Sequence, residues 1–272
     1  REERQGRAGV CGVELAVAVI LGLAIGIGAV YYVMVLNKIQ AFLYNPEAFI
    51  LVYGGTVGSV LISYPWEIIK QALGAMRLVL FPRRRMPKAE VISMMVSLSE
   101  QAKRGGVRSL QKSIEALPSG QGFLQDGLQM VVDGLDRDIL QTNLEKSLVF
   151  INKRHDEVAG VYRLCGVYAP IFGLLGTLIG VVQVLRHLTD PGKLGTYMAI
   201  AVTATFYGIF GANFFFLPIA SKLSAQSGDE LLIKEVMVEG ILAIQQGDIP
   251  LIVEKKLHAY LAHRMRQQAA EA

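Results

Sequence analysis

Cysteines, charged residues and catalytic motifs are all scarce in this sequence. Its two cysteines, Cys11 and Cys165, lie far apart beside apolar stretches, so they form neither a disulfide framework nor a zinc-binding motif. No nucleophile is suitably spaced from a base, no loop has a phosphate-binding pattern, and the four histidines are isolated from one another. We therefore expect no enzyme activity, no metal site and no bound cofactor.

The low charge content argues against an ordinary soluble protein. Charged residues make up 18% of the chain and hydrophobic residues 52%, with a mean hydropathy of +0.40, whereas soluble domains average about 25% charged residues. The net charge of +4 is too small to indicate a nucleic-acid partner. Because the charges are also unevenly placed, the composition predicts a protein embedded in a lipid bilayer, with a polar portion outside it.

Four apolar runs are long enough to cross a bilayer as helices. They cover residues 13–36, 48–66, 164–185 and 194–221, and each is close to the roughly 20 residues that a helix needs to cross about 30 Å of hydrocarbon. The first run is too long for the apolar region of a secretory signal. We therefore expect an all-α integral membrane protein with four transmembrane helices.

The distribution of basic residues predicts the orientation of these helices. Fourteen Lys and Arg residues lie in the polar stretch 67–159, but only one lies in the turn 37–46 and two in the turn 186–196. Basic residues concentrate on the cytoplasmic side of membranes, so we expect both termini and the polar stretch in the cytoplasm. We predict that residues 1–66 hold the N-terminal segment and transmembrane helices 1 and 2, and that residues 67–159 form a helical cytoplasmic domain. Residues 160–220 then hold transmembrane helices 3 and 4, and residues 221–272 form cytoplasmic C-terminal helices.

Glycines recur in the first two runs at spacings that favour close helix packing. Gly22 and Gly26 are about one helical turn apart, and Gly54, Gly55 and Gly58 form a second patch of small residues. A glycine lets a neighbouring helix come close because it has no side chain. We therefore expect these five glycines to lie at helix contacts. The alternative is that membrane helices tolerate them without a specific contact.

The interiors of the runs lack acidic groups but hold hydroxyls and prolines. Thr177, Thr203 and Thr205 supply the hydroxyls, and Pro170 and Pro218 each free a backbone carbonyl in the preceding turn. Such oxygens can line a polar path or contact a cation, but they do not take up and release protons at useful pKa values. If the protein conducts ions, a partner chain should supply the acid. The alternative is that the threonines bond to their own helices and the prolines only bend them.

Several segments together resemble one protein family, the A subunits of flagellar motor stators (MotA/PomA). NPEAFILVYGGTVGSVLIS, YAPIFGLLGTLIGVV and AVTATFYGIFGANFFFLPIASKL are similar to the second, third and fourth membrane spans of that family. Two further segments are similar to its cytoplasmic parts. The three membrane matches lie at residues 45–63, 168–182 and 201–223, and the two cytoplasmic matches lie at residues 130–140 and 235–257. Their order and spacing agree over nearly the whole chain after residue 13.

The resemblance implies an ion-driven machine in the inner membrane of a bacterial cell. In this family, five A subunits surround two B subunits of the MotB/PomB type, each with an aspartate on its single membrane helix. Ion flow through that site rotates the A ring, whose cytoplasmic domain pushes on a rotor switch protein of the FliG type. The B subunit would thus supply the missing acid, and the only bound species would be the permeant H⁺ or Na⁺.

The resemblance also assigns the ion pathway. Pro170 and Pro218 match the two functional prolines of the family, and Thr177 and Thr205 match its two hydroxyls.

The coupling ion follows less directly from the resemblance. Sodium-type members carry a threonine at the position of Ala204, and its absence favours protons. Thr203 is one residue away, about 100° around a helix, and is a poor substitute. Thr177 and the wording TFYGIFGANFFFLPIA are closer to the sodium-type branch, so we favour protons only slightly.

The same resemblance places the rotor contact in the segment AKRGGVRSLQKSIE. Lys103 and Arg104 occupy its basic positions, and Gln111 stands where the family has an acidic residue. Glu115, one helical turn later, is a candidate substitute for that acid. The alternative is that Arg104 and Arg108 only form a solvated face.

Two other functions remain compatible with the sequence. One is an energiser of outer-membrane transport of the ExbB/TolQ type, for which three spans and a different loop order are expected. The other is a membrane scaffold that conducts nothing.

Overall fold

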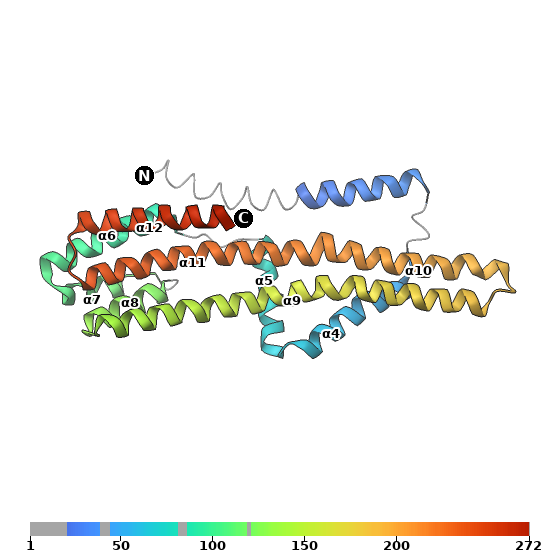
Figure 1. The fold of residues 1–272 in the computed structure, drawn as a ribbon, viewed down its shortest axis with the longest axis horizontal. Helices are drawn as coiled ribbons and strands as arrows, with labels where there is room; N and C mark the ends of the chain where they lie inside the picture. Colours follow the sequence, from blue (N-terminus) through green and yellow to red (C-terminus); the bar gives the residue numbers. More distant parts are fainter. Residues whose placement is uncertain (1–20, 39–43, 81–85, 119–120, 272) are drawn as a thin grey trace. The chain divides into compact units, whose positions relative to one another are not determined.

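Helices form every regular element in the described part of the chain (Figure 1). The computed structural model describes residues 21–38, 44–80, 86–118 and 121–271. The prediction of an all-α protein is confirmed for these ranges.

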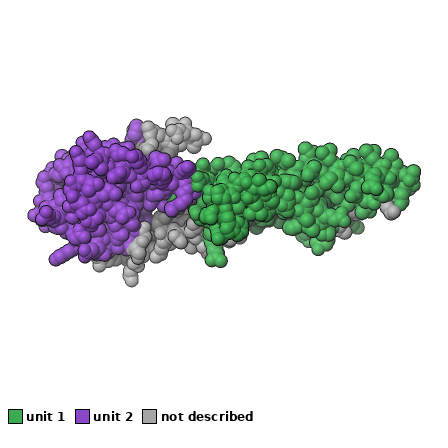
Figure 2. All heavy atoms as spheres, turned by 90° about the horizontal axis from the view of Figure 1, so that it is seen from below, with its two compact units in different colours: residues 1–84, 155–225 green, residues 85–154, 226–272 purple. Residues whose placement is uncertain are grey.

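The chain divides into two compact units, each made of two separate stretches of sequence (Figure 2). Unit 1 consists of residues 1–84 and 155–225, and unit 2 consists of residues 85–154 and 226–272. Two long helices, α9 (Arg137–Arg186) and α11 (Leu217–Gln245), contribute residues to both units. Most of the predicted cytoplasmic domain therefore joins the C-terminal residues in unit 2, although we expected these as separate segments.

Unit 2 has one apolar core, to which both of its stretches contribute. Its elements are the beginning of α9, the end of α11, and α6 (Lys88–Gly105), the 3-10 helix η2 (Val107–Leu110), α7 (Gln111–Glu115), α8 (Gly122–Val132) and α12 (Pro250–Glu271). Val91, Met95 and Leu98 are buried on one face of α6, at the helical spacing seen in the sequence. Met95 lies against Gly240 of α11. Each stretch has only one apolar face, so the core requires both.

Two helices of unit 2 end in a left-handed glycine turn. Gly134 after α8 and Gly247 after α11 have φ angles of 78° and 71°, a conformation that glycine adopts without steric cost. After α11, the Asp248 N–H donates to the Ala243 carbonyl at 3.1 Å, and the equivalent bond forms after α8. This Schellman arrangement satisfies the last carbonyls of each helix and reverses the chain.

Three helical stretches among the described residues are long and apolar enough to cross a membrane. They lie in Pro46–Ser63, Arg137–Arg186 and Leu194–Gln245, and correspond to the second, third and fourth predicted spans. The first predicted span is described only in part, as the shorter apolar helix Leu21–Leu36. Its residues 13–20 lie outside the described ranges.

Two of the predicted spans contain a π-helical turn. The order is α3 (Pro46–Phe49), η1 (Ile50–Gly54) and α4 (Gly55–Ser63) in the second span, and α10 (Pro191–Gly211), η3 (Ala212–Phe216) and α11 in the fourth. Pro218 is the second residue of α11, two residues after η3 ends at Phe216. Because the proline ring clashes with the carbonyl four residues earlier in a regular helix, the wider π turn gives that carbonyl room.

The helix α5 (Trp66–Leu80) belongs to unit 1, although we predicted residues 67–159 as one cytoplasmic domain. Its buried side chains include Ile69 and Ala72. The Tyr162 hydroxyl on α9 donates to the Ala72 carbonyl at 2.7 Å. This buried bond attaches α5 to the long helix α9.

Candidate functional site

Helices α9 and α10 pack with their backbones nearly in contact along a seam of glycines. A Cβ added to Gly173 would lie 2.9 Å from the Ala204 carbonyl oxygen, and one added to Gly208 would lie 2.5 Å from the Ala169 carbonyl oxygen. Gly180 faces α10 in the same way, further along α9. Real side chains essentially never come this close to a backbone, so only glycine permits this approach.

Across this seam, the hydroxyl oxygens of Thr177 and Thr205 lie 2.5 Å apart. Both side chains are half-buried. The Gly173 carbonyl oxygen lies 3.2 Å from the Thr177 hydroxyl and 3.4 Å from the Thr205 hydroxyl, and the Ala201 carbonyl oxygen lies 3.5 Å from the latter. The threonines therefore bond to each other as well as to their own helices. Since each hydroxyl has one proton and two lone pairs, this oxygen cluster keeps lone pairs that can contact a cation.

The residues next to Thr205 on α10 lie on other faces of the helix. Ala204 is fully buried, and its side chain lies against Gly176 of α9. Thr203 is only 2% exposed and lies about 200° around the helix from Thr205. The hydroxyl pair therefore consists of Thr177 and Thr205.

A side-chain contact between α9 and α11 lies near the two prolines. Gly166, about one turn before Pro170, lies against the side chain of Leu217, which directly precedes Pro218. Pro170 is half-buried beside Gly208, whereas Pro218 is exposed. The hydroxyl pair begins about 10 Å further along α9. The structure thus brings Thr177 and Thr205 into direct contact, whereas Pro170 and Pro218 have different neighbours.

Two of the five predicted packing glycines receive an aromatic ring within the chain. Gly26 lies against Phe214, and Gly55 lies against Phe172. At the other three, an added Cβ would meet open space or only its own helix; these are Gly22, Gly54 and Gly58. Contacts of those three with a neighbouring chain remain a prediction. The glycine seam between α9 and α10 was missed, although its pattern is present in the segment YAPIFGLLGTLIGVV.

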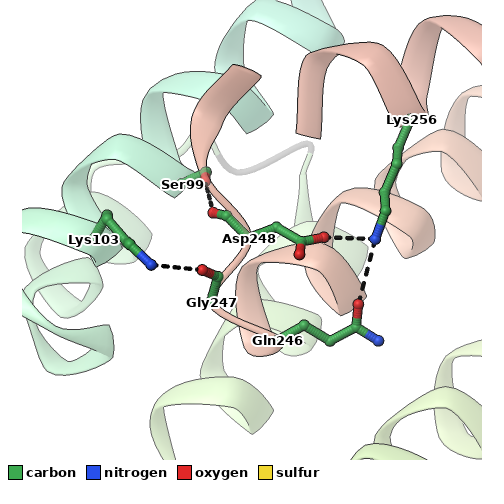
Figure 3. A network of polar contacts seen from close by, with 6 residues as sticks. All are labelled: Ser99, Lys103, Gln246, Gly247, Asp248 and Lys256. Carbon is green, nitrogen blue, oxygen red and sulfur yellow. Dashed lines mark hydrogen bonds and ion pairs between the residues drawn. The ribbon is translucent and has the colours of Figure 1, made fainter. Parts of the chain in front are cut away.

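The predicted rotor-facing residues lie in unit 2, and two of them have partners on the same protein. The Lys103 ammonium donates to the Gly247 carbonyl at 2.9 Å (Figure 3). Arg104 forms an ion pair with Glu100, one turn earlier on α6. Lys103 therefore helps to hold the turn between α11 and α12, while the exposed Arg104 guanidinium lies at the surface.

A second bond attaches α6 to the same turn. The Ser99 hydroxyl donates to the Asp248 carbonyl at 3.1 Å, and the Asp248 carboxylate forms an ion pair with Lys256 at 2.6 Å. Figure 3 shows these contacts converging on the turn from α6 and α12. The turn is thus fixed to the helix that carries the predicted basic contact residues.

Gln111 and Glu115 lie one turn apart on α7. The Gln111 amide donates to the Glu115 carboxylate at 3.4 Å, and Glu115 is exposed. The predicted substitute acid therefore lies beside the position that lacks one. Sequence reasoning missed Glu100, although its spacing of four residues from Arg104 is the signal for an ion pair on a helix.

Within the residues that the structure describes, no group of three or more His, Cys, Asp or Glu side chains could hold a metal ion.

Known proteins are similar to this chain over nearly its whole length. Residues 118–236 match the MotA/TolQ/ExbB proton channel family. Motility protein A of Bacillus subtilis is 31% identical over 253 residues, covering 93% of each chain. Chemotaxis protein PomA of Vibrio alginolyticus is 32% identical over 246 residues, covering 90% of this chain and 94% of PomA. The chain belongs to the motility protein A family.

A solved structure in this family has the same fold. The flagellar MotAB stator complex from Bacillus subtilis contains a chain that matches with a TM-score of 0.80 and 31% identity, covering 92% of this chain and 98% of that chain. The resemblance seen in the sequence is thus confirmed. The family is described as a channel family rather than an enzyme family. The long apolar helices of this chain agree with a membrane protein.

Proposed function

We propose that this protein is the ion-conducting A subunit of a flagellar motor stator, which converts ion flow across the membrane into torque together with a B subunit of the MotB/PomB type. Membership of the motility protein A family and the likeness to the MotAB complex support this proposal. The structural observation that carries it is the Thr177–Thr205 hydroxyl pair between two apolar helices. The pair places polar oxygens at a helix contact between otherwise apolar spans, where a polar side chain or an ion can reach them.

The B subunit supplies the acid of the pathway. The Thr177 and Thr205 hydroxyls hold their protons across the physiological pH range and cannot relay them alone. An aspartate on a membrane helix of the B subunit could take up an ion and be approached by these oxygens. Pro170 in α9 and Pro218 in α11 would let these helices bend as the aspartate changes charge.

The coupling ion in this proposal is H⁺, favoured slightly over Na⁺. Dehydrated Na⁺ needs several oxygen ligands to replace its water shell. Ala204 contributes a fully buried methyl group where, by the family resemblance, sodium-type members carry a threonine.

The rotor contact lies on α6 and α7 and faces a rotor switch protein of the FliG type. Arg104 and Glu115 are exposed and provide charges of both signs. Gln111 supports Glu115 through its hydrogen bond, and Lys103 acts in part by holding the turn at Gly247. Exposed contacts of this kind steer association and weaken as ionic strength rises.

The subunit lies in the bacterial inner membrane, crosses it four times and keeps both termini in the cytoplasm. The concentration of basic residues in 67–159 supports this orientation. Five copies would surround two B subunits, as the family resemblance implies.

Restoration of swimming tests the proposed function. In a non-swimming strain that lacks its own stator genes, this chain with its B partner should restore swimming, and neither chain should do so alone. Pro170→Leu should abolish swimming while leaving the amount of protein in the membrane unchanged. Swimming without the B partner, or unimpaired swimming of the Pro170→Leu variant, would contradict the proposal.

A further inference from the structure

Helix α5 carries an exposed surface that the proposed function does not use. One face of the helix is buried in unit 1, through Ile69, Ala72, Ala75 and Val79. The opposite face exposes the stripe Trp66, Lys70, Leu73 and Arg77. At about 100° per residue, these four side chains fall within roughly 60° of one another. They therefore form a continuous strip along the helix.

The buried face places α5 at a particular level of the two long helices. Ala72 accepts a hydrogen bond from Tyr162 of α9 and belongs to the same apolar cluster as Ala220 of α11. Tyr162 directly precedes Arg163, after which α9 has no charged residue until Arg186. Ala220 lies just before Lys222, the first charged residue of α11. Helix α5 thus packs where both long helices change from apolar to charged, which is the depth of lipid headgroups.

The exposed side chains of α5 are also ordered around its axis. Leu73 and Trp66 are 62% and 54% exposed, and Met76, further from the cations, is 39% exposed. Next to them come Arg77 and Lys70, and beyond these the exposed polar residues Glu67 and Gln71. Around the helix axis, an apolar sector is thus followed by a basic sector and then by a polar one. Helices that lie in the interface of a membrane have this arrangement.

Charge and aromatic character indicate which lipid the stripe fits. The Lys70 ammonium lies 5.6 Å from the centre of the Trp66 ring, so the ring and the cation share one patch. The acidic residue of this helix, Glu67, lies roughly 60° or more around from Lys70 and outside the stripe. A stripe with two cations and no acid attracts anionic groups, and tryptophan favours the headgroup layer.

We propose that the stripe Trp66, Lys70, Leu73 and Arg77 binds the headgroups of anionic phospholipids and anchors α5 at the membrane surface. The inference rests on the proposed placement of the protein in a membrane. A second copy of the chain is the less favoured occupant, because it would have to bury both cations, which is costly without matching acids.

The single tryptophan of the chain, Trp66, allows a direct test. The purified A/B complex is placed in phosphatidylcholine bilayers that contain equal fractions of either brominated phosphatidylglycerol or brominated phosphatidylcholine. Bromine quenches tryptophan fluorescence on contact. Fluorescence from the B subunit is subtracted with a complex that carries Trp66→Phe. We expect stronger quenching by the anionic lipid, with local enrichment of about fivefold for each basic side chain.

Paired charge variants separate the stripe from the net charge of the protein. In the double variant Lys70→Gln with Arg77→Gln, both brominated lipids should quench the Trp66 fluorescence equally. The control pair Lys146→Gln with Lys153→Gln removes the same charge from exposed positions on α9 and should keep the wild-type difference. Equal quenching of the wild type by both lipids would overturn the proposal. So would no quenching by either, since a protein neighbour would then cover the stripe.

This measurement is independent of ion flow and torque. A complex that shows the lipid preference but fails to restore swimming would support the α5 site and contradict the proposed motor function. A complex that restores swimming without the preference would do the reverse.

Discussion

At the scale of single residues, the proposed ion path rests on two hydroxyls in an apolar surrounding. The Thr177 and Thr205 oxygens lie 2.5 Å apart, on helices that share no sequence neighbourhood. Each could have bonded only to its own helix, and each does so in part. Their mutual bond is what makes them one polar site.

Removing one hydroxyl should slow ion passage sharply. Thr205→Val keeps the shape but removes the Thr205 hydroxyl from the cluster, while Thr177 can still donate to the Gly173 carbonyl. Losing one oxygen contact to a charged group costs about 1.5–3 kcal/mol. We expect ion flux and swimming torque to fall about tenfold or more, and Thr205→Ser to restore most of the loss. Thr142→Val, at an exposed position of α9, is the control and should have no effect. Normal torque with Thr205→Val would remove this pair from the pathway.

The buried methyl group of Ala204 bears on the coupling ion. Because this residue adds no oxygen to the cluster, we expect swimming speed to follow the proton motive force. Speed should stay constant when sodium is replaced by potassium at fixed pH. A speed that rises with sodium, and that a sodium-channel blocker abolishes, would show that the ion is Na⁺.

At the scale of elements, the helix contacts depend on where glycines meet a neighbour. Gly173 and Gly208 allow the backbones of α9 and α10 to come together, whereas Gly22 and Gly58 face open space within the chain. The spacing of small residues was similar in both cases. The partner helix decides which glycines are required.

A single methyl group in the seam should therefore destabilise the protein. The Cβ of Gly208→Ala would lie 2.5 Å from the Ala169 carbonyl oxygen, and such overpacking costs about 1–3 kcal/mol. We expect the melting temperature of the complex in detergent to fall by several degrees. Gly28→Ala is the matched control, because its Cβ would meet nothing within 4 Å and alanine favours a helix. Equal melting temperatures of the two variants would show that the seam is looser than the structure has it.

At the scale of the whole molecule, the chain is made of two units that each combine distant segments. Unit 2 takes its core from α6 to α8, from the beginnings of α9 and α12 and from the end of α11. Unit 1 holds the apolar helices and α5. The proposed ion path of unit 1 contains hydroxyls and carbonyls, and in our proposal a B subunit supplies its acid.

The composition of that assembly is a further prediction. Native mass spectrometry of the purified complex should give five copies of this chain for two B subunits. Replacing the membrane aspartate of the B subunit by asparagine should leave this ratio unchanged and stop proton uptake by vesicles, because the A subunit alone offers only hydroxyls and carbonyls. Proton uptake that persists in this variant would place the acid in the A subunit.

The amino-acid sequence was sufficient to predict the helices and the membrane character, and it led us to propose a partner acid. These follow from hydrophobic periodicity, run length and residue type, which are local properties. It also identified Thr177 and Thr205 as candidates, since hydroxyls are conspicuous in apolar runs. The family of the protein was evident from the order and spacing of whole segments.

Only the tertiary structure decided which of these features meet. It joined Thr177 to Thr205, gave the closest backbone contact to Gly173 and Gly208, and assigned Lys103 to the turn at Gly247. It also moved α5 from the expected cytoplasmic domain into unit 1. Periodicity shows which face of a helix is apolar, but the partner of that face depends on segments far away in the chain, and is settled only when all of them pack at once.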